Sequence, residues 1–333
     1  MTAAADPALP VLDPSLEIVD AHHHLGDKYD PPYFLDELLA DVGAGHRVTQ
    51  TIFVECGGGW PKGPNQELVS IPEIEAVAAM AMESRARGGA QISGIVGHID
   101  LRLGVPATNR ALDAASAAAQ GLLVGIRHAT AWDESPQLPT HRTNPGPALL
   151  GSETFRLGLA ELARRNLAYD AWLFHPQLPE LEAVAGRIPD LKIVVDHLGG
   201  PLGIGPYSPH DVDADWRSSM SALARHENVF VKLGGIGMPL MVMSEHRGAT
   251  ATAELLAKLW GDRISWCIDT FGPTRCMFES DFPVDRATCS YSTIWTTFKM
   301  ISHDFSDSEK AALFHQTARD VYGLQPIAPA GES

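Results

Sequence analysis

Eight short runs of apolar and β-branched residues recur along the chain, and a longer segment with helical spacing follows each of them. Short apolar runs that alternate with helical segments are typical of repeated βα units, which build parallel sheets. We expect strands at residues 17–25, 48–56, 91–101, 122–131, 167–175, 191–199, 229–235 and 275–283. We expect helices at residues 34–42, 71–87, 109–120, 152–166, 178–188, 215–227, 251–268, 291–302 and 307–323.

Eight βα units favour a single (β/α)8 TIM barrel over a doubly wound α/β sheet. A dinucleotide-binding sheet would carry a G-x-G-x-x-G run between a strand and a helix, and none stands in that context. A chain of 333 residues would suggest two domains, but barrels longer than about 250 residues are commonly one domain. We expect one barrel over residues 17–324, an N-terminal extension over 1–16 and a C-terminal tail over 325–333.

Charge and composition exclude several classes of partner. Lys and Arg number 25 against 41 Asp and Glu, a net charge of −16, so we expect no binding to nucleic acid or to an anionic membrane surface. No apolar run approaches the roughly 20 residues of a membrane helix. The first residues lack a secretory signal, and the four cysteines form no CxxC pair. We therefore expect a cytoplasmic protein that acts on a small-molecule substrate, with a homo-oligomer left open.

Polar residues gather where the predicted strands end. Seven of the eight strand ends carry His, Asp or Glu, as in DAHHHLGD, GIRHAT, VVDHLGG and FESDFP. A strand that simply runs into a turn would end in Gly, Asn or Ser. Because the active site of a TIM barrel lies at the carboxyl ends of its strands, these residues are the candidates for its chemistry.

The run His22-His23-His24 follows the first apolar strand directly. Strand side chains alternate between faces, so His22 and His24 point the same way and His23 points the other way. Two imidazoles spaced in this manner can bind one metal ion at about 2.0–2.1 Å. The alternative is a polar turn that contains histidines by chance.

Three later strand ends add His175, His197 and Asp281. Either histidine alone would more often be a buried structural residue, but both lie on consecutive strands of a barrel that begins with H-x-H. Asp281 ends the last strand, which adjoins the first strand when a barrel closes. There it could bind the metal and accept a proton from water. Alternatively, it caps the turn that follows, and Glu279 on the same face is a competing or supporting carboxylate.

Residues near other strand ends and in long loops are candidates for substrate contact. Arg127 could bind a substrate carboxylate or form a structural ion pair, and by alternation only one of Arg127 and His128 points into the barrel. Trp60 and Tyr207 stand in long loops that could cover the site, although loop packing is the commoner role. A strand lysine, Lys232, requires an acidic partner or a role in the site.

Several longer strings resemble a known family. DAHHHLGD, GIRHA, PQLPEL, KIVVDHLGGP, VFVKLGG and CMFESDFPVD resemble the amidohydrolase-2 family of the amidohydrolase superfamily. Within this family they are most similar to the lactonase-like branch, whose members hydrolyse sugar lactones, pyrone dicarboxylate and muconolactones. The resemblance extends from Ile18 to Leu324 and is specific for the family, not for a substrate.

The resemblance implies roles for the strand-end residues. It implies His22, His24, His175 and Asp281 as ligands of one divalent metal ion, with Zn²⁺ the favoured ion, although some relatives act without a metal. It also implies Asp281 as the general base and His197 as the group that orients or polarises the substrate carbonyl. Many relatives carry a carboxylated lysine on the fourth strand that bridges two metals, whereas this strand reads GIRHAT.

The missing lysine argues against a lysine-bridged pair of metals. Glu55, at the end of the second strand, could bridge in its place, contact the substrate or support a ligand from behind. The function that this set of residues predicts is metal-assisted hydrolysis of a lactone or related carboxylic ester. Two alternatives remain: a metal-dependent decarboxylase of an aromatic acid, which the same superfamily contains, and a non-catalytic barrel that binds a small molecule.

Overall fold

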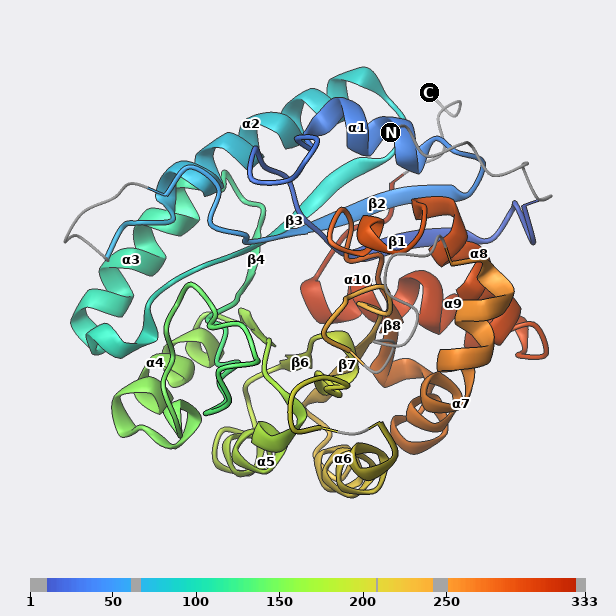
Figure 1. Cartoon of the computed structure of the whole chain (residues 1–333). Helices are drawn as coiled ribbons and strands as arrows, with labels where there is room; N and C mark the ends of the chain where they lie inside the picture. The colour runs from blue at the N-terminus through green and yellow to red at the C-terminus, as the bar shows by residue number, and fades with distance from the viewer. Residues whose placement is uncertain (1–10, 61–66, 208, 242–250, 328–333) are drawn as a thin grey trace.

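The computed structural model describes residues 11–60, 67–207, 209–241 and 251–327. Eight parallel strands form one sheet in chain order from β1 to β8 (Figure 1). The strands are β1 (Glu17–His23), β2 (Arg47–Val54), β3 (Gln91–Gly97), β4 (Leu123–Ile126), β5 (Ala168–Ala171), β6 (Ile193–Val195), β7 (Val229–Leu233) and β8 (Cys276–Phe278). Just beyond β8, the Asp281 N–H donates to the carbonyl of His22 (3.0 Å) and the His24 N–H to that of Phe282 (2.7 Å). These contacts bring the last strand to the first and confirm the predicted barrel.

Helices connect successive strands and surround the sheet (Figure 1). They are α1 (Leu35–Val42), α2 (Ile71–Arg87), α3 (Val105–Ala118), α4 (Glu153–Arg164), α5 (Leu178–Arg187), α6 (Pro209–Ala224), α7 (Ala253–Phe271), α8 (Tyr291–Ile301), α9 (Asp307–Ala311) and α10 (Thr317–Tyr322). A π-helical turn, Ala312–Gln316, joins α9 to α10 within the helix expected over 307–323. Two helices begin earlier than predicted. In α3 a proline occupies the first turn, where it costs no backbone hydrogen bond.

All eight strands end earlier than predicted. The difference is largest for β3, β4, β5, β6 and β8, which stop at Gly97, Ile126, Ala171, Val195 and Phe278, several residues before the apolar runs end. Beyond β6 and β8 the backbone turns left-handed, with φ of 53° at His197 and 52° at Asp281. Left-handed backbone interrupts a β ladder and is uncommon for residues other than glycine. The polar strand ends therefore lie in turns just above the barrel.

The barrel has an inner and an outer apolar layer. The outer layer packs the helices against the strands. The inner cluster combines strand residues such as Val19, Ile52 and Val194 with Val321 and Tyr322 of α10. The C-terminal helix thus closes the amino-terminal end of the barrel and leaves the carboxyl ends of the strands for a site.

The structure also bears on the expected membrane segments, the cysteines and the domain boundaries. No helix among the described residues is long and apolar enough to cross a membrane. All four cysteines are buried and free of disulfide bonds. The boundaries at residues 16 and 325 remain predictions, since residues 1–10 and 328–333 lie outside the described ranges.

Candidate metal centre and active site

The two histidines that flank His23 face each other. The Nε2 atoms of His22 and His24 lie 3.3 Å apart. The His24 Nδ1–H donates to the carbonyl of Val54 (2.7 Å), and His22 Nδ1 lies 2.9 Å from a carboxylate oxygen of Glu279. Burial, together with nearby positive charges, lowers the pKa of His24 well below its usual value. Since acceptors take the Nδ1 hydrogens, both Nε2 lone pairs point into the same space, the arrangement found in metal-bound histidines.

Asp281 completes this cluster. Its Oδ1 atom lies 3.4 Å from His24 Nε2 and 3.8 Å from His22 Nε2, and its Oδ2 atom is buried without a hydrogen-bond partner among the described residues. Ligand atoms around a tetrahedral ion with bonds of about 2.0–2.1 Å lie about 3.3–3.4 Å apart. The three donor atoms therefore fit one divalent cation, and two imidazoles with a carboxylate form a donor set that zinc accepts.

A second group of possible ligands, His22, His197 and Glu279, is better explained by hydrogen bonds. The Glu279 carboxylate lies 2.7 Å from His197 Nδ1 and 2.9 Å from His22 Nδ1. Burial alone would lower the pKa of His197, but Glu279 and Asp281 outweigh it and raise the pKa to about 9. The Lys232 ammonium, 3.3 Å from His22 Nδ1, adds another positive charge. The protonated His197 and the Lys232 ammonium thus already neutralise the charge of Glu279. The Glu279 carboxylate orients the two histidines.

Asp20 links β1 to the segment that carries Asp281. Its carboxylate accepts hydrogen bonds from the Ser280 N–H (2.9 Å), the Ser280 hydroxyl (2.6 Å) and the Tyr291 hydroxyl (2.9 Å). Burial raises the pKa of Asp20 to about 6 despite these donors. Because Ser280 immediately precedes Asp281, this fully buried carboxylate holds both halves of the metal cluster together.

A buried ion network lies beneath the cluster. The Lys232 ammonium is 2.6 Å from Asp170 and 3.3 Å from Asp196, and all three side chains are fully buried. The hydroxyl of Tyr322 on α10 also donates to Asp170 (2.8 Å). Asp170 and Asp196 are therefore the acidic partners expected for Lys232, and the network connects the C-terminal helix to His22.

Arg127 points into the barrel and forms ion pairs. Its guanidinium donates to Glu55 (2.9 Å), lies 3.4 Å from Asp196, and approaches His22 Nε2 at 3.2 Å. The Glu55 carboxylate is also paired with Arg142. Glu55 thus neutralises the charges of two guanidinium groups. It belongs to neither of the two candidate metal clusters among the described residues. The structural ion pair considered for Arg127 is present, and the residue also lines the cavity above the cluster.

A cavity of about 280 Å³ opens over the metal cluster. His24, His197 and Asp281 contribute to its wall, and three cationic side chains, those of Lys28, Arg127 and Arg142, contribute as well. Its apolar lining includes Trp172, Phe174, Met238, Leu240 and Val284. A cavity with polar groups at one part of an apolar wall is the usual form of a small-molecule site.

Sequence reasoning missed several lining residues. His141 and Arg142 come from the long segment between β4 and α4, and Lys28 comes from the loop after β1. Trp172 follows β5 directly, so its place beyond an apolar strand was the one available signal. Nothing in the local pattern of the loops marks Lys28 or Arg142.

His128 and Trp60 lie outside this cavity. His128 faces away from Arg127, as strand alternation predicts; its Nδ1 accepts the Leu101 N–H (3.1 Å) and its ring packs against Phe155. The Trp60 indole N–H donates to Glu73 (3.0 Å). The Arg142 guanidinium lies over the Trp60 ring, 5.0 Å from the ring centroid. Trp60 therefore supports a lining residue from behind.

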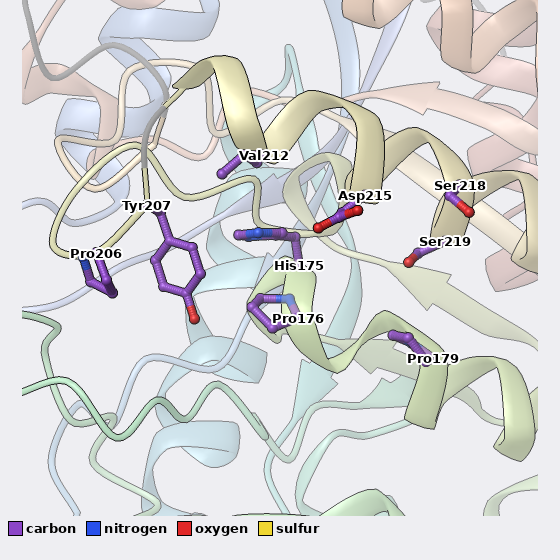
Figure 2. Close-up of a pocket in the computed structure, with 9 residues that line it drawn as sticks. All are labelled: His175, Pro176, Pro179, Pro206, Tyr207, Val212, Asp215, Ser218 and Ser219. Atoms are coloured by element: carbon purple, nitrogen blue, oxygen red, sulfur yellow. The ribbon is translucent and has the colours of Figure 1, made fainter.

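His175 and Tyr207 lie together in a different place. The chain leaves β5 at Ala171, and His175 begins a short 3₁₀ turn, His175–Gln177. Its Nδ1 accepts the N–H of Leu202 (3.3 Å), and its ring packs against Tyr207 with ring centroids 5.0 Å apart. Both residues line a second cavity (Figure 2). The structure does not bring His175 to the metal cluster, because the turn directs its side chain away from the barrel axis.

Comparisons with known proteins agree with this fold. An uncharacterized protein of Sinorhizobium fredii is 35% identical over 176 residues, and an L-fucono-1,5-lactonase of Burkholderia multivorans is 30% identical over 189 residues. These matches cover 53% and 55% of this chain but only 54% and 60% of the relatives' lengths. An L-fucono-1,5-lactonase of Burkholderia ambifaria is 28% identical over 80% of this chain and 81% of its own.

Solved structures share the architecture at lower identity. A crystal structure of an amidohydrolase from Burkholderia multivorans with bound Zn has a TM-score of 0.71 at 22% identity, over 92% of this chain and 99% of that chain. The 5-carboxyvanillate decarboxylase of Sphingomonas paucimobilis has a TM-score of 0.53 at 11% identity, over 93% and 100%. The amidohydrolase-2 family model matches residues 19–324, so the chain belongs to the amidohydrolase family.

Proposed function

We propose that this protein is a metal-dependent hydrolase that opens a small-molecule lactone. The observation that carries the proposal is the cluster of His22 Nε2, His24 Nε2 and Asp281 Oδ1 at metal-ligand spacing in the wall of a cavity. Relatives named L-fucono-1,5-lactonase support the choice of a lactone. The donor set and a related structure with bound Zn support Zn²⁺ as the ion.

A divalent cation in this cluster would polarise an ester carbonyl and lower the pKa of a water molecule. Asp281 would accept the proton of that water, since its Oδ2 atom has no hydrogen-bond partner among the described residues. His197, held by Glu279 at Nδ1, would donate from Nε2 to the carbonyl oxygen. The water oxygen would bond to the carbonyl carbon, and the ring C–O bond would break. Asp281 would then pass the proton taken from water to the leaving alkoxide, and the new carboxylic acid would release its own proton to give a hydroxy acid anion.

We propose Lys28, Arg127 and Arg142 as the groups that attract an anionic substituent of the substrate or the new product carboxylate. Three cations line one cavity of a protein whose net charge is −16. The Lys28 ammonium donates to the carbonyl of Cys56 (2.6 Å), and no carboxylate among the described residues pairs with it within salt-bridge distance. A substrate carboxylate would supply this missing partner.

The four buried free thiols support the further proposal that the enzyme works in the reducing cytoplasm.

Metal removal tests the function directly. After chelation and dialysis, we expect lactone hydrolysis to fall at least 100-fold and to return with about one zinc per chain. The assay is proton release from a panel of sugar lactones, carboxylated pyrones and muconolactones, with metal content measured in parallel. Unchanged hydrolysis by metal-free protein would refute the metal dependence. Carbon dioxide release from aromatic acids would favour the decarboxylase, and no turnover of either panel would favour a binding barrel.

Lys28→Met tests the anionic substituent. We expect KM for a carboxylated lactone to rise about 10-fold with little change in kcat, because a charge-assisted hydrogen bond is worth roughly 1.5–3 kcal/mol when buried and less at an exposed lysine. Lys258→Met removes an exposed lysine from α7 and serves as the control. Equal effects of Lys28→Met on a carboxylated lactone and its neutral analogue would contradict the prediction.

A further inference from the structure

A second cavity, of about 430 Å³, lies close to the catalytic one. Figure 2 shows the residues that line it. Its wall comes from the turn after β5, the start of α5, the loop after β6 and residues 212–219 of α6. Among the described residues, it shares no lining residue with the catalytic cavity. The chain separates the two at adjacent positions: Phe174 lines the catalytic cavity and His175 lines the second one. The proposed hydrolysis makes no use of this space.

His175 is a polar side chain in this wall. Its side chain is nearly buried, at 6% exposure. The N–H of Leu202 donates to its Nδ1 atom (3.3 Å), and the ring is also hydrogen-bonded to the backbone of Gly200. Burial lowers the pKa of His175 to about 4, so the ring is neutral near pH 7. A neutral imidazole carries one donor nitrogen and one acceptor nitrogen, and a ligand hydroxyl can pair with either.

The rest of the lining restricts what that ligand is. Asp215 offers carboxylate oxygens, and Ser218 and Ser219 offer hydroxyls that donate or accept. Tyr207, Val212 and three prolines form apolar surface around these groups. No Lys or Arg stands among the described residues of the lining, so Asp215 would repel an anion. A ligand with many hydroxyls on an apolar carbon framework, and without charge, satisfies all of these groups.

We propose that this cavity is a binding site for a neutral monosaccharide-sized polyol. His175 forms a hydrogen bond with a hydroxyl group, Asp215 accepts from one or two hydroxyls, and the ring of Tyr207 packs against the C–H face of the sugar. The volume is within the usual range of about 300–1,000 Å³ for small-molecule pockets. This site is independent of the proposed hydrolysis and persists whether or not the catalytic function is correct.

A backbone hydrogen bond connects the walls of the two cavities. In the loop after β6, the Gly203 N–H donates to the carbonyl of Leu240 (3.1 Å), and Leu240 lines the catalytic cavity. Tyr207, at the end of the same loop, donates to Asp133 (2.5 Å). Binding at the second site therefore has to be measured separately from binding at the first.

The test measures binding of D-glucose, D-galactose and myo-inositol to the zinc-loaded full chain by saturation-transfer NMR and calorimetry. D-Galactonate is the anionic comparison. We expect at least one neutral compound to bind with a Kd in the millimolar range or tighter, and D-galactonate to bind at least 10-fold more weakly. Asp215→Ala should weaken the neutral ligand at least 10-fold, whereas Asp190→Ala, at an exposed position in the turn between α5 and β6, should leave it unchanged.

Two further variants distinguish the cavities. Ser219→Trp should fill the second cavity and abolish sugar binding, and His175→Ala should weaken it while the protein retains about one zinc per chain. No binding at 50 mM of any neutral probe, or binding unaffected by Asp215→Ala, overturns the proposal. Binding lost in Lys28→Met but kept in Asp215→Ala would assign the sugar to the catalytic cavity and also overturn it. If the protein hydrolyses no lactone, the sugar-binding test still decides the proposal, because it measures binding and not turnover.

Discussion

Asp281→Asn is expected to lower kcat for lactone hydrolysis by about 10³-fold, the usual size of a general-base contribution. Asn keeps the shape of the side chain and can keep an oxygen at the position of Oδ1. A lower kcat of the variant therefore measures the loss of the general base. In the folded chain, Oδ1 lies 3.4 Å from His24 Nε2, and Oδ2 is the free atom that would take the proton. The measurement is kcat at saturating zinc, with the bound metal counted for each variant.

Stability distinguishes loss of chemistry from loss of structure. Burial raises the pKa of Asp281 in the metal-free chain, so its ionised form is costly there. Metal-free Asp281→Asn should therefore unfold at the same temperature as metal-free wild type or a higher one. Asp269→Asn, an exposed position on α7, is the matched control and should keep full activity. A kcat within threefold of wild type at full zinc occupancy would show that another group accepts the proton.

Lys232→Met is expected to lower the free energy of unfolding by about 3–5 kcal/mol, as loss of one partner of a buried ion pair does. Burial alone would lower the pKa of Lys232, but Asp170 and Asp196 outweigh it and raise the pKa. Methionine fills a similar volume yet leaves both fully buried carboxylates without the ammonium. At a fixed scan rate we expect Tm to fall by about 4–7 °C, because the unfolding entropy grows with chain length.

A double variant shows whether charge pairing causes this loss. Asp170→Asn removes one negative charge but can keep the hydrogen bond from Tyr322. In the Lys232→Met/Asp170→Asn chain, we expect at least half of the lost stability to return. Lys192→Met is the control, because Lys192 donates only to the carbonyl of Val321 (3.0 Å); it should cost about 1 kcal/mol or less. Additive losses in the double variant would contradict the charge-pairing explanation.

The parts of the site that follow a strand directly were predictable. His22 and His24 share a face because side chains of a strand alternate, and the same rule separated Arg127 from His128. Asp281 could be paired with the first strand because the strands of a barrel close in chain order. Each of these inferences needs only local periodicity and the fold class, and both can be read from the pattern of apolar and polar residues along the sequence.

Residues beyond the first turn of a loop were not predictable. His175 belongs to the same apolar run as β5, yet the strand stops at Ala171 and the next turn carries the histidine into the second cavity. Lys28 and Arg142 reach the catalytic cavity from loops with no periodic pattern. The path of a loop depends on what it packs against, so local sequence does not specify it.

The amino-acid sequence alone determined the barrel, the order of its strands and the face on which the H-x-H pair and Asp281 meet. Only the tertiary structure decided which charges neutralise one another: Glu55 with two arginines, Glu279 with two histidines, and Lys232 with two aspartates. It also separated His175 from the metal cluster. The reason is that alternation and helical period act between near neighbours, whereas buried charges find their partners on distant strands, as His22 and Lys232 do at a separation of 210 residues.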